Sequence, residues 1–265
     1  MTAAGSAPIT VDAPQWRLSD DLAAAAAAAL SAGADGLQLD FGGAHRGPRL
    51  DLPDRLAEAR RLSPSIPVTA IAVNHANDVG LVAEDGTPNP VAEELLRAGL
   101  RSAVAIGVPV LHVPGFRRST PSSPARITGT ASVLRGLVDD AAPHGVAVAY
   151  ESALDGPASR ALAEAVWRSS LGLVLDVGNL LDAGHSPWSF PAAVGPRLHR
   201  CVHVKDAVTR PEARPVAALP LAPAVRSVLV ENDYRTAPER LAADISAVRI
   251  RLSHPIEGAS CARSL

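Results

Sequence analysis

The chain has 265 residues, of which 47% are hydrophobic and 20% are charged, and its net charge is −2. This composition allows a sizeable core and excludes bulk disorder, and the near-neutral charge gives no reason to expect nucleic acid or an anionic membrane as a partner. The two cysteines, Cys201 and Cys261, lie far apart and form no CxxC pair. We therefore expect neither a disulfide framework nor a thiolate zinc cluster, and we expect a cytoplasmic location.

Strand-like and helix-like segments alternate along the whole chain. We expect the first helix to be capped by Ser19 and to end at Gly33, and its alanine-rich run at 22–30 is too short to span a membrane. The expected elements, in chain order, are a strand at 9–11, a helix at 19–32, a strand at 36–41, a helix at 52–62, a strand at 67–73, a helix within 89–107, a strand at 108–113, a helix at about 125–142, a strand at 146–151, a helix at 157–168, a strand within 171–179, a helix near 187–194, a strand at about 202–206, a strand at 227–231 and a helix at 237–251.

This alternation predicts an α/β protein with a parallel sheet. About eight such units in roughly 250 residues predict a single (β/α)8 TIM barrel over residues 1–265, with loose tails at 1–8 and about 254–265. A doubly wound open sheet is the alternative. It has less support, because the chain contains no GxGxxG and no GxxxxGK[ST] motif that would mark a dinucleotide or P-loop site.

Four successive strands end in a residue that can hold a metal ion. The period-two alternation of the strands points all four side chains to the barrel interior, at the carboxyl ends where such barrels carry their active sites. Three carboxylates and one imidazole would suit Mn²⁺, Mg²⁺ or Co²⁺ and leave positions open for substrate or water. The alternative is a set of strand-end ion pairs. The four residues are Glu151, Asp176, His203 and Glu231.

Five short segments resemble the sugar phosphate isomerase/epimerase family, the xylose-isomerase-like TIM barrels. They are residues 31–39 (SAGADGLQL), 148–151 (VAYE), 175–179 (LDVGN), 203–206 (HVKD) and 229–231 (LVE). The resemblance implies one divalent metal ion, manganese before magnesium, cobalt or zinc, held by Glu151, Asp176, His203 and Glu231. In the ketose epimerases of this family the two glutamates also act as acid and base.

The expected chemistry follows from that arrangement. A metal ion that chelates a carbonyl oxygen and the neighbouring hydroxyl stabilises an enediolate, and two flanking glutamates can remove a proton from one face and return it to the other. That sequence inverts the carbon centre. Return of the proton to the adjacent carbon would isomerise the substrate, and loss of a β-hydroxyl would dehydrate it.

Two departures from the resemblance affect the predicted function. Asn179 stands three residues after Asp176 and is a poor ligand, and no histidine closely follows Asp206, which argues against the trinuclear zinc nucleases of the same superfamily. Residues 207–225 contain four prolines and no glycine, where the family usually carries a glycine-bearing loop. Because this segment helps to shape the substrate pocket, the identity of the substrate stays open.

Further residues are candidates for substrate binding. Lys205 can hold a substrate oxygen or phosphate, or can instead pair with Asp40 or Asp206. A histidine near a strand end can line the pocket or serve as a hydrogen-bonded structural residue, and an arginine pair at 117–118 can bind phosphate or belong to an exposed charged loop. The candidates for substrate binding are Lys205, Asn179, His75, His112 and Asp40.

We therefore predict a metal-dependent isomerase or epimerase of carbohydrate metabolism that acts on a small sugar, sugar phosphate or related polyhydroxy carbonyl compound. The rival enzyme is a metal-dependent dehydratase on the same site, similar to inosose or dehydroshikimate dehydratases. The rival of another class is a non-catalytic barrel that binds a sugar or a partner. A homodimer or a homotetramer is compatible with the sequence.

Overall fold

Eight parallel strands close into one barrel, in the order in which they occur along the chain. The computed structural model describes residues 8–206 and 224–253. Within these residues β8 pairs with β1, with Val11 beside Val228, so the sheet has no free edge. The predicted TIM barrel is confirmed. The strands are β1 (Thr10–Pro14), β2 (Gly36–Asp40), β3 (Val68–Ala72), β4 (Val110–Gly115), β5 (Ala147–Ser152), β6 (Leu171–Asp176), β7 (Leu198–Val204) and β8 (Ser227–Val230).

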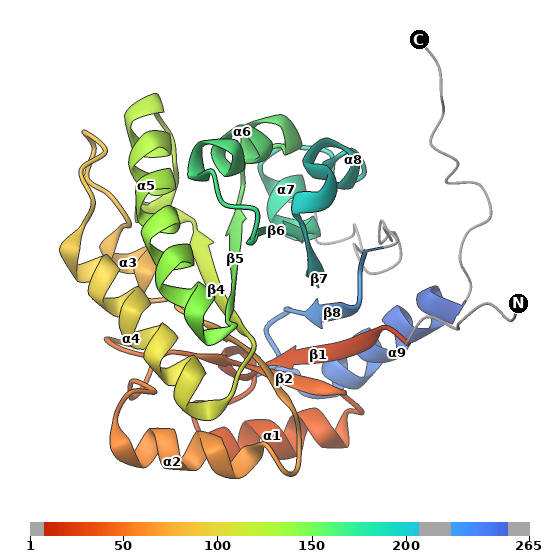
Figure 1. Ribbon diagram of the computed structural model, residues 1–265. Helices are drawn as coiled ribbons and strands as arrows, with labels where there is room; N and C mark the ends of the chain where they lie inside the picture. The colour runs from red at the N-terminus through yellow and green to blue at the C-terminus, as the bar shows by residue number, and fades with distance from the viewer. Residues whose placement is uncertain (1–7, 207–223, 254–265) are drawn as a thin grey trace, which may run out of the picture.

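The helices lie outside the barrel, where α1 and α2 cover the β1–β2 side and α4 and α5 flank β4 (Figure 1). No helix of the described residues is both long and apolar enough to cross a membrane. The expected tails, apart from Pro8, and nearly all of the 207–225 segment fall outside the described residues, as does Cys261. The helices are α1 (Leu22–Ser31), α2 (Pro53–Leu62), α3 (Ala76–Val79), α4 (Pro90–Ile106), α5 (Pro124–Ala141), α6 (Gly156–Val166), α7 (Val177–Asp182), α8 (Phe190–Val194) and α9 (Glu239–Ser253).

The strands bury two different faces, as a parallel barrel requires. On β7, Val202 and Val204 belong to the apolar core between sheet and helices. Cys201 and His203 have the opposite parity and are also buried, inside the barrel, where Gln38 Nε2 lies 3.5 Å from Cys201 Sγ. The alternation read from the sequence therefore sorts the side chains correctly, and it directs the polar ones toward the barrel axis.

The starts of α1 and α7 differ from the expected ones. The N-cap of α1 is Asp21, whose Oδ1 accepts a hydrogen bond from the Ala24 amide, while Ser19 Oγ accepts from the Asp21 amide in the preceding turn. The helix α7 was not expected, because Val177 continues the apolar alternation of β6. The strand nevertheless ends at Asp176, since the carboxylate of that residue caps α7 by accepting from the Asn179 amide at 2.8 Å.

Candidate functional site

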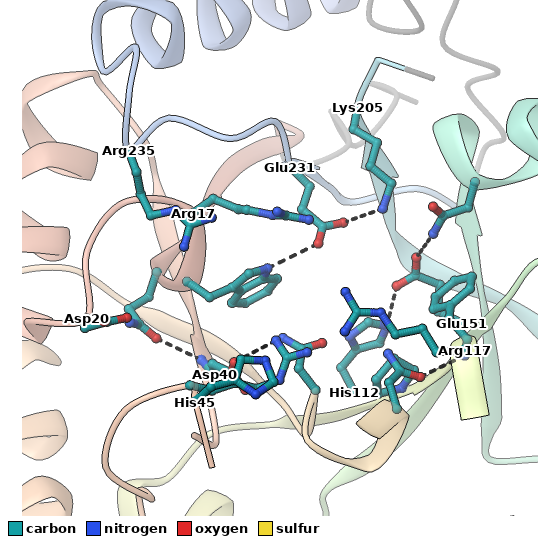
Figure 2. A pocket seen from close by; sticks show the side chains of 18 residues that line it. Arg17, Asp20, Asp40, His45, His112, Arg117, Glu151, Lys205, Glu231 and Arg235 are labelled. Carbon is teal, nitrogen blue, oxygen red and sulfur yellow. Dashed lines mark hydrogen bonds and ion pairs between the residues drawn. The ribbon is translucent and has the colours of Figure 1, made fainter. Parts of the chain in front are cut away.

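A cavity of about 470 Å³ is lined by side chains from the carboxyl ends of the barrel strands and from the loops that follow them (Figure 2). Glu151 and Glu231 line it directly. Asp176 and His203 lie behind them and are only 1% and 2% exposed. This position at the carboxyl ends of the strands is the one that the barrel fold assigns to an active site.

The four predicted metal-binding residues come together. Glu151, Asp176, His203 and Glu231 each offer one ligand atom, and these four atoms lie within 4.8 Å of one another. The geometry follows from strand register, because Asp176 pairs with His203 across β6 and β7. A second set, formed by His112 with Glu151 and His203, meets the same distance criterion. The sequence therefore located the cluster but did not include His112 among its ligand-type members.

Glu151 is held from three sides. Its Oε2 lies 2.9 Å from His112 Nε2 and 3.1 Å from His203 Nδ1, and its Oε1 accepts a hydrogen bond of 2.8 Å from Asn179 Nδ2. Burial would raise the pKa of this carboxyl, but the two imidazoles outweigh burial and hold the pKa well below its usual value. Glu151 is therefore a carboxylate at neutral pH.

Lys205 occupies the centre of the negative cluster. Its Nζ lies 2.7 Å from Asp176 Oδ2 and 3.1 Å from Glu231 Oε2, so neither Asp40 nor Asp206, the alternatives read from the sequence, is its partner. Asp206 pairs instead with Arg240 on α9. The ammonium group reaches the cluster because Gly178 has no side chain, and a Cβ there would come within 2.6 Å of Lys205 Cγ.

Two cationic side chains among the described residues face the three carboxylates of the cluster. Lys205 is one cation, and the Glu151 carboxylate raises the pKa of His203 well above its usual value against the effect of burial, while Trp16 Nε1 adds a neutral donor 3.2 Å from Glu231 Oε1. Burial, together with the carboxylates of Glu151 and Glu231, raises the pKa of Asp176 to about 8 against the opposing effect of Lys205. One of the three acids therefore retains a proton near neutral pH unless a further cation binds.

A divalent cation fits this donor set. His203 Nδ1 is buried, makes no hydrogen bond of acceptable geometry within the described residues and lies between Glu151 and Glu231. A metal ion that binds here would displace the proton of His203. An imidazole nitrogen beside three carboxylate oxygens is a ligand set that manganese, magnesium, cobalt and zinc accept. The buried residues can thus hold one metal ion, and their chemistry does not select which one.

The predicted substrate-binding residues divide into two groups. Lys205, Asn179, His112 and Asp40 line the cavity. Burial raises the pKa of Asp40 to about 6. His75 does not line the cavity; it precedes α3 behind the β2–α2 loop, where a Cβ on Gly43 would come within 2.6 Å of its Nδ1.

The loop after β1 supplies cavity residues that sequence reasoning missed. Gln15, Trp16 and Arg17 form a 3-10 turn that lines the cavity, and Arg235 lines it from the loop after β8. The expected first strand ended at Val11, whereas β1 runs to Pro14. If the strand had been predicted to run to Pro14, Trp16 and Arg17 would have followed directly after a strand end. A position at a strand end is the signal that identified the other site residues.

Comparison with known proteins places the chain in a family. Residues 26–235 match the xylose isomerase-like TIM barrels. A 2-epi-5-epi-valiolone 7-phosphate 2-epimerase from Actinoplanes sp. is 35% identical over 251 residues, which cover 89% of this chain and 92% of the relative.

Solved structures share the fold at lower identity. A 3-keto-D-glucoside 4-epimerase from E. coli superimposes with a TM-score of 0.69 at 14% identity, covering 91% of this chain and 99% of the other. A probable 3-DHS dehydratase from Bacillus anthracis gives 0.65 at 13% identity, covering 93% and 100%. The fold thus occurs in both epimerases and a dehydratase, and the family match and the 35% identical epimerase together show that this chain belongs to the xylose isomerase-like TIM barrels as an isomerase or epimerase.

Proposed function

We propose that the chain is a divalent-metal-dependent epimerase that inverts a carbon beside the carbonyl group of a phosphorylated, cyclic polyhydroxy ketone. The observation that carries the proposal is the pair of glutamates, Glu151 and Glu231, which line one cavity from β5 and from the end of β8 and belong to one ligand cluster. The relative at 35% identity, which is named for a 7-phosphate substrate and for epimerisation at position 2, supports the substrate class.

Glu151, Asp176, His203 and Glu231 would hold the metal ion. When bound, a divalent cation polarises the substrate carbonyl and so acidifies the neighbouring carbon. The protein would contribute the placement of these ligands, because each is buried and lies at or just beyond a strand end. His112 supports this layer by its contact with Glu151.

The two glutamates would transfer the proton. The partners of each carboxylate keep it charged: the imidazoles of His112 and His203 at Glu151, and the ammonium of Lys205 at Glu231. Burial raises the pKa of Glu231, but Lys205 outweighs burial and lowers it. A carboxylate on either side of the reacting carbon can remove the proton from one face and return it to the other, and the result is inversion without change of mass.

The test is turnover of 2-epi-5-epi-valiolone 7-phosphate and of its unphosphorylated counterpart by purified protein, with Mn²⁺ and with EDTA. We expect a stereoisomer of unchanged mass, identified by NMR, and a rate that depends on the metal ion. A product lighter by one water would make the protein a dehydratase. Saturable binding without any product would make it a binding barrel, and either result would contradict the proposal.

A further inference from the structure

The arginines at the rim of the cavity differ in whether they already have a carboxylate partner within the protein. Arg46 and Arg117 share the carboxylate of Asp78, with Arg46 Nε at 2.9 Å and Arg117 Nη1 at 3.0 Å from its oxygens. Arg235 directs Nε and Nη2 at Asp233, at 3.0 and 2.8 Å. Three of the arginines that line the cavity therefore have a carboxylate partner inside the protein.

Arg17 is the exception. Its side chain is half-buried and lines the cavity, and its buried Nε has no hydrogen-bond partner among residues 8–206 and 224–253. A buried guanidinium nitrogen without an acceptor is unfavourable, and a ligand in the cavity that the Arg17 side chain lines can supply one. The residue is held in place through its backbone, because the Tyr234 amide donates a hydrogen bond of 3.0 Å to the Arg17 carbonyl oxygen.

The nearby carboxylates do not require the charge of Arg17. Glu231 already faces Lys205 Nζ at 3.1 Å and Trp16 Nε1 at 3.2 Å. Asp233 is bound by two nitrogens of Arg235, and this contact, together with the more distant charge of Arg17, lowers the pKa of Asp233 to about 2. Both carboxylates thus have closer partners, and the positive charge of Arg17 remains available to a ligand.

The position of Arg17 suits a substrate group that is attached at a distance from the reacting carbon. Trp16, its neighbour in the chain, contacts Glu231. Arg17 and Arg235 lie on the Glu231 side of the cavity, whereas Arg117 lies on the Glu151 side (Figure 2). A ligand whose reacting carbon lies between the two glutamates can therefore extend toward Arg17 past Glu231.

We propose that Arg17 forms the subsite for the phosphate group of the substrate, at the rim of the barrel between the loops after β1 and β8. This inference rests on the proposed function for the identity of the anion. A phosphomonoester carries nearly two negative charges at neutral pH, and an unpaired guanidinium can bind two of its oxygens side by side. Specificity for a phosphorylated substrate would then come from the β1–β8 side of the cavity and not from the arginines that share Asp78.

The experiment compares kcat/KM for the phosphorylated and the unphosphorylated ketone in four variants. We expect Arg17→Gln to lower kcat/KM for the phosphorylated ketone by roughly 10- to 100-fold and to leave the value for the unphosphorylated one within a few-fold. Arg17→Lys should restore part of the loss, because it keeps the charge but not the paired donors. Arg117→Gln tests the opposite wall, and Arg160→Gln on α6, which removes an exposed arginine paired with Glu164, controls for net charge.

Binding of inorganic phosphate, measured by calorimetry in the presence of Mn²⁺, separates this inference from the proposed function. If neither ketone is turned over but phosphate affinity falls in Arg17→Gln and persists in Arg117→Gln and Arg160→Gln, the subsite stands and the epimerase proposal fails. The subsite would be overturned if Arg17→Gln lowered kcat/KM equally for both ketones, or if Arg117→Gln, and not Arg17→Gln, lowered kcat/KM for the phosphorylated ketone. It would also be overturned if the wild-type protein neither bound phosphate at millimolar concentration nor distinguished the two ketones.

Discussion

Buried ionisable residues occur in this barrel both within the cluster of Glu151, Asp176, His203 and Glu231 and outside it. Asp12 lies on β1 inside the barrel and is 1% exposed. Its Oδ2 accepts a hydrogen bond of 2.7 Å from Thr69 Oγ1, while its Oδ1 has no partner within the described residues. Burial, opposed in part by Thr69, raises the pKa of Asp12 from 3.8 to about 6.

The elevated pKa of Asp12 predicts a pH-dependent change in stability. Between pH 3.8 and about 6 the folded protein holds a proton that the unfolded chain has released, so the contribution of Asp12 is fully present below pH 3.8 and is lost as the pH rises through 6. Asp12→Asn keeps the neutral form at every pH. It should therefore raise the free energy of unfolding at pH 8 by roughly 1–3 kcal/mol relative to the wild type, and by much less at pH 4.

Urea unfolding of the wild type and of Asp12→Asn at pH 4 and pH 8 measures this effect. The difference between the two proteins isolates the contribution of Asp12, because other groups that titrate in this range are common to both. A difference that is the same at both pH values, or a variant that is less stable at pH 8, would show that folding does not raise the pKa of Asp12.

At the scale of elements, the two glycines of α5 distinguish helix propensity from packing. A Cβ on Gly129 would lie 2.0 Å from the Gly86 carbonyl oxygen, in the turn before α4, whereas a Cβ on Gly136 would have nothing within 4 Å. Gly129→Ala should therefore destabilise the protein by about 1–3 kcal/mol, because the backbone of the turn must move. Gly136→Ala should stabilise it by up to about 1 kcal/mol through helix propensity.

Thermal unfolding of both glycine variants provides the measurement, and each is the matched control of the other. Opposite shifts of the melting temperature are expected. Shifts of the same sign would mean that α5 does not pack against the 83–87 turn as closely as the structure indicates, or that the turn yields without loss of stability.

The same elements show what the sequence could and could not predict. The inward parity of Glu151, Asp176, His203 and Glu231 was readable because strand alternation and strand ends are local properties of the chain. The partners of Lys205 were not readable, since they depend on the register between β7, β6 and β8. Helix α7 was missed because its first residue, Val177, continues an apolar alternation, and only the capping contact of Asp176 ends the strand there.

At the scale of the whole molecule, the distribution of charge is more informative than its sum. The net charge of −2 gave no indication of an anionic ligand. The cavity nevertheless has arginines at its rim and a carboxylate cluster at its floor. A substrate with a phosphate at one end and a chelating ketone at the other matches this polarity, and neither end would be recognised from composition alone.

The central claim is proton transfer by two glutamates at a carbon beside a carbonyl group, and exchange with solvent in D₂O tests it most directly. A proton held by Glu151 or Glu231, both of which line the cavity, can exchange with water before it returns. Wild-type protein with Mn²⁺ should therefore place deuterium at the inverted carbon, detected by NMR or mass spectrometry. Deuterium incorporation should disappear with EDTA, and in Glu151→Gln and Glu231→Gln turnover should fall by roughly 10²- to 10⁴-fold. Conversion of the substrate at the wild-type rate with complete retention of the carbon-bound hydrogen would contradict the account.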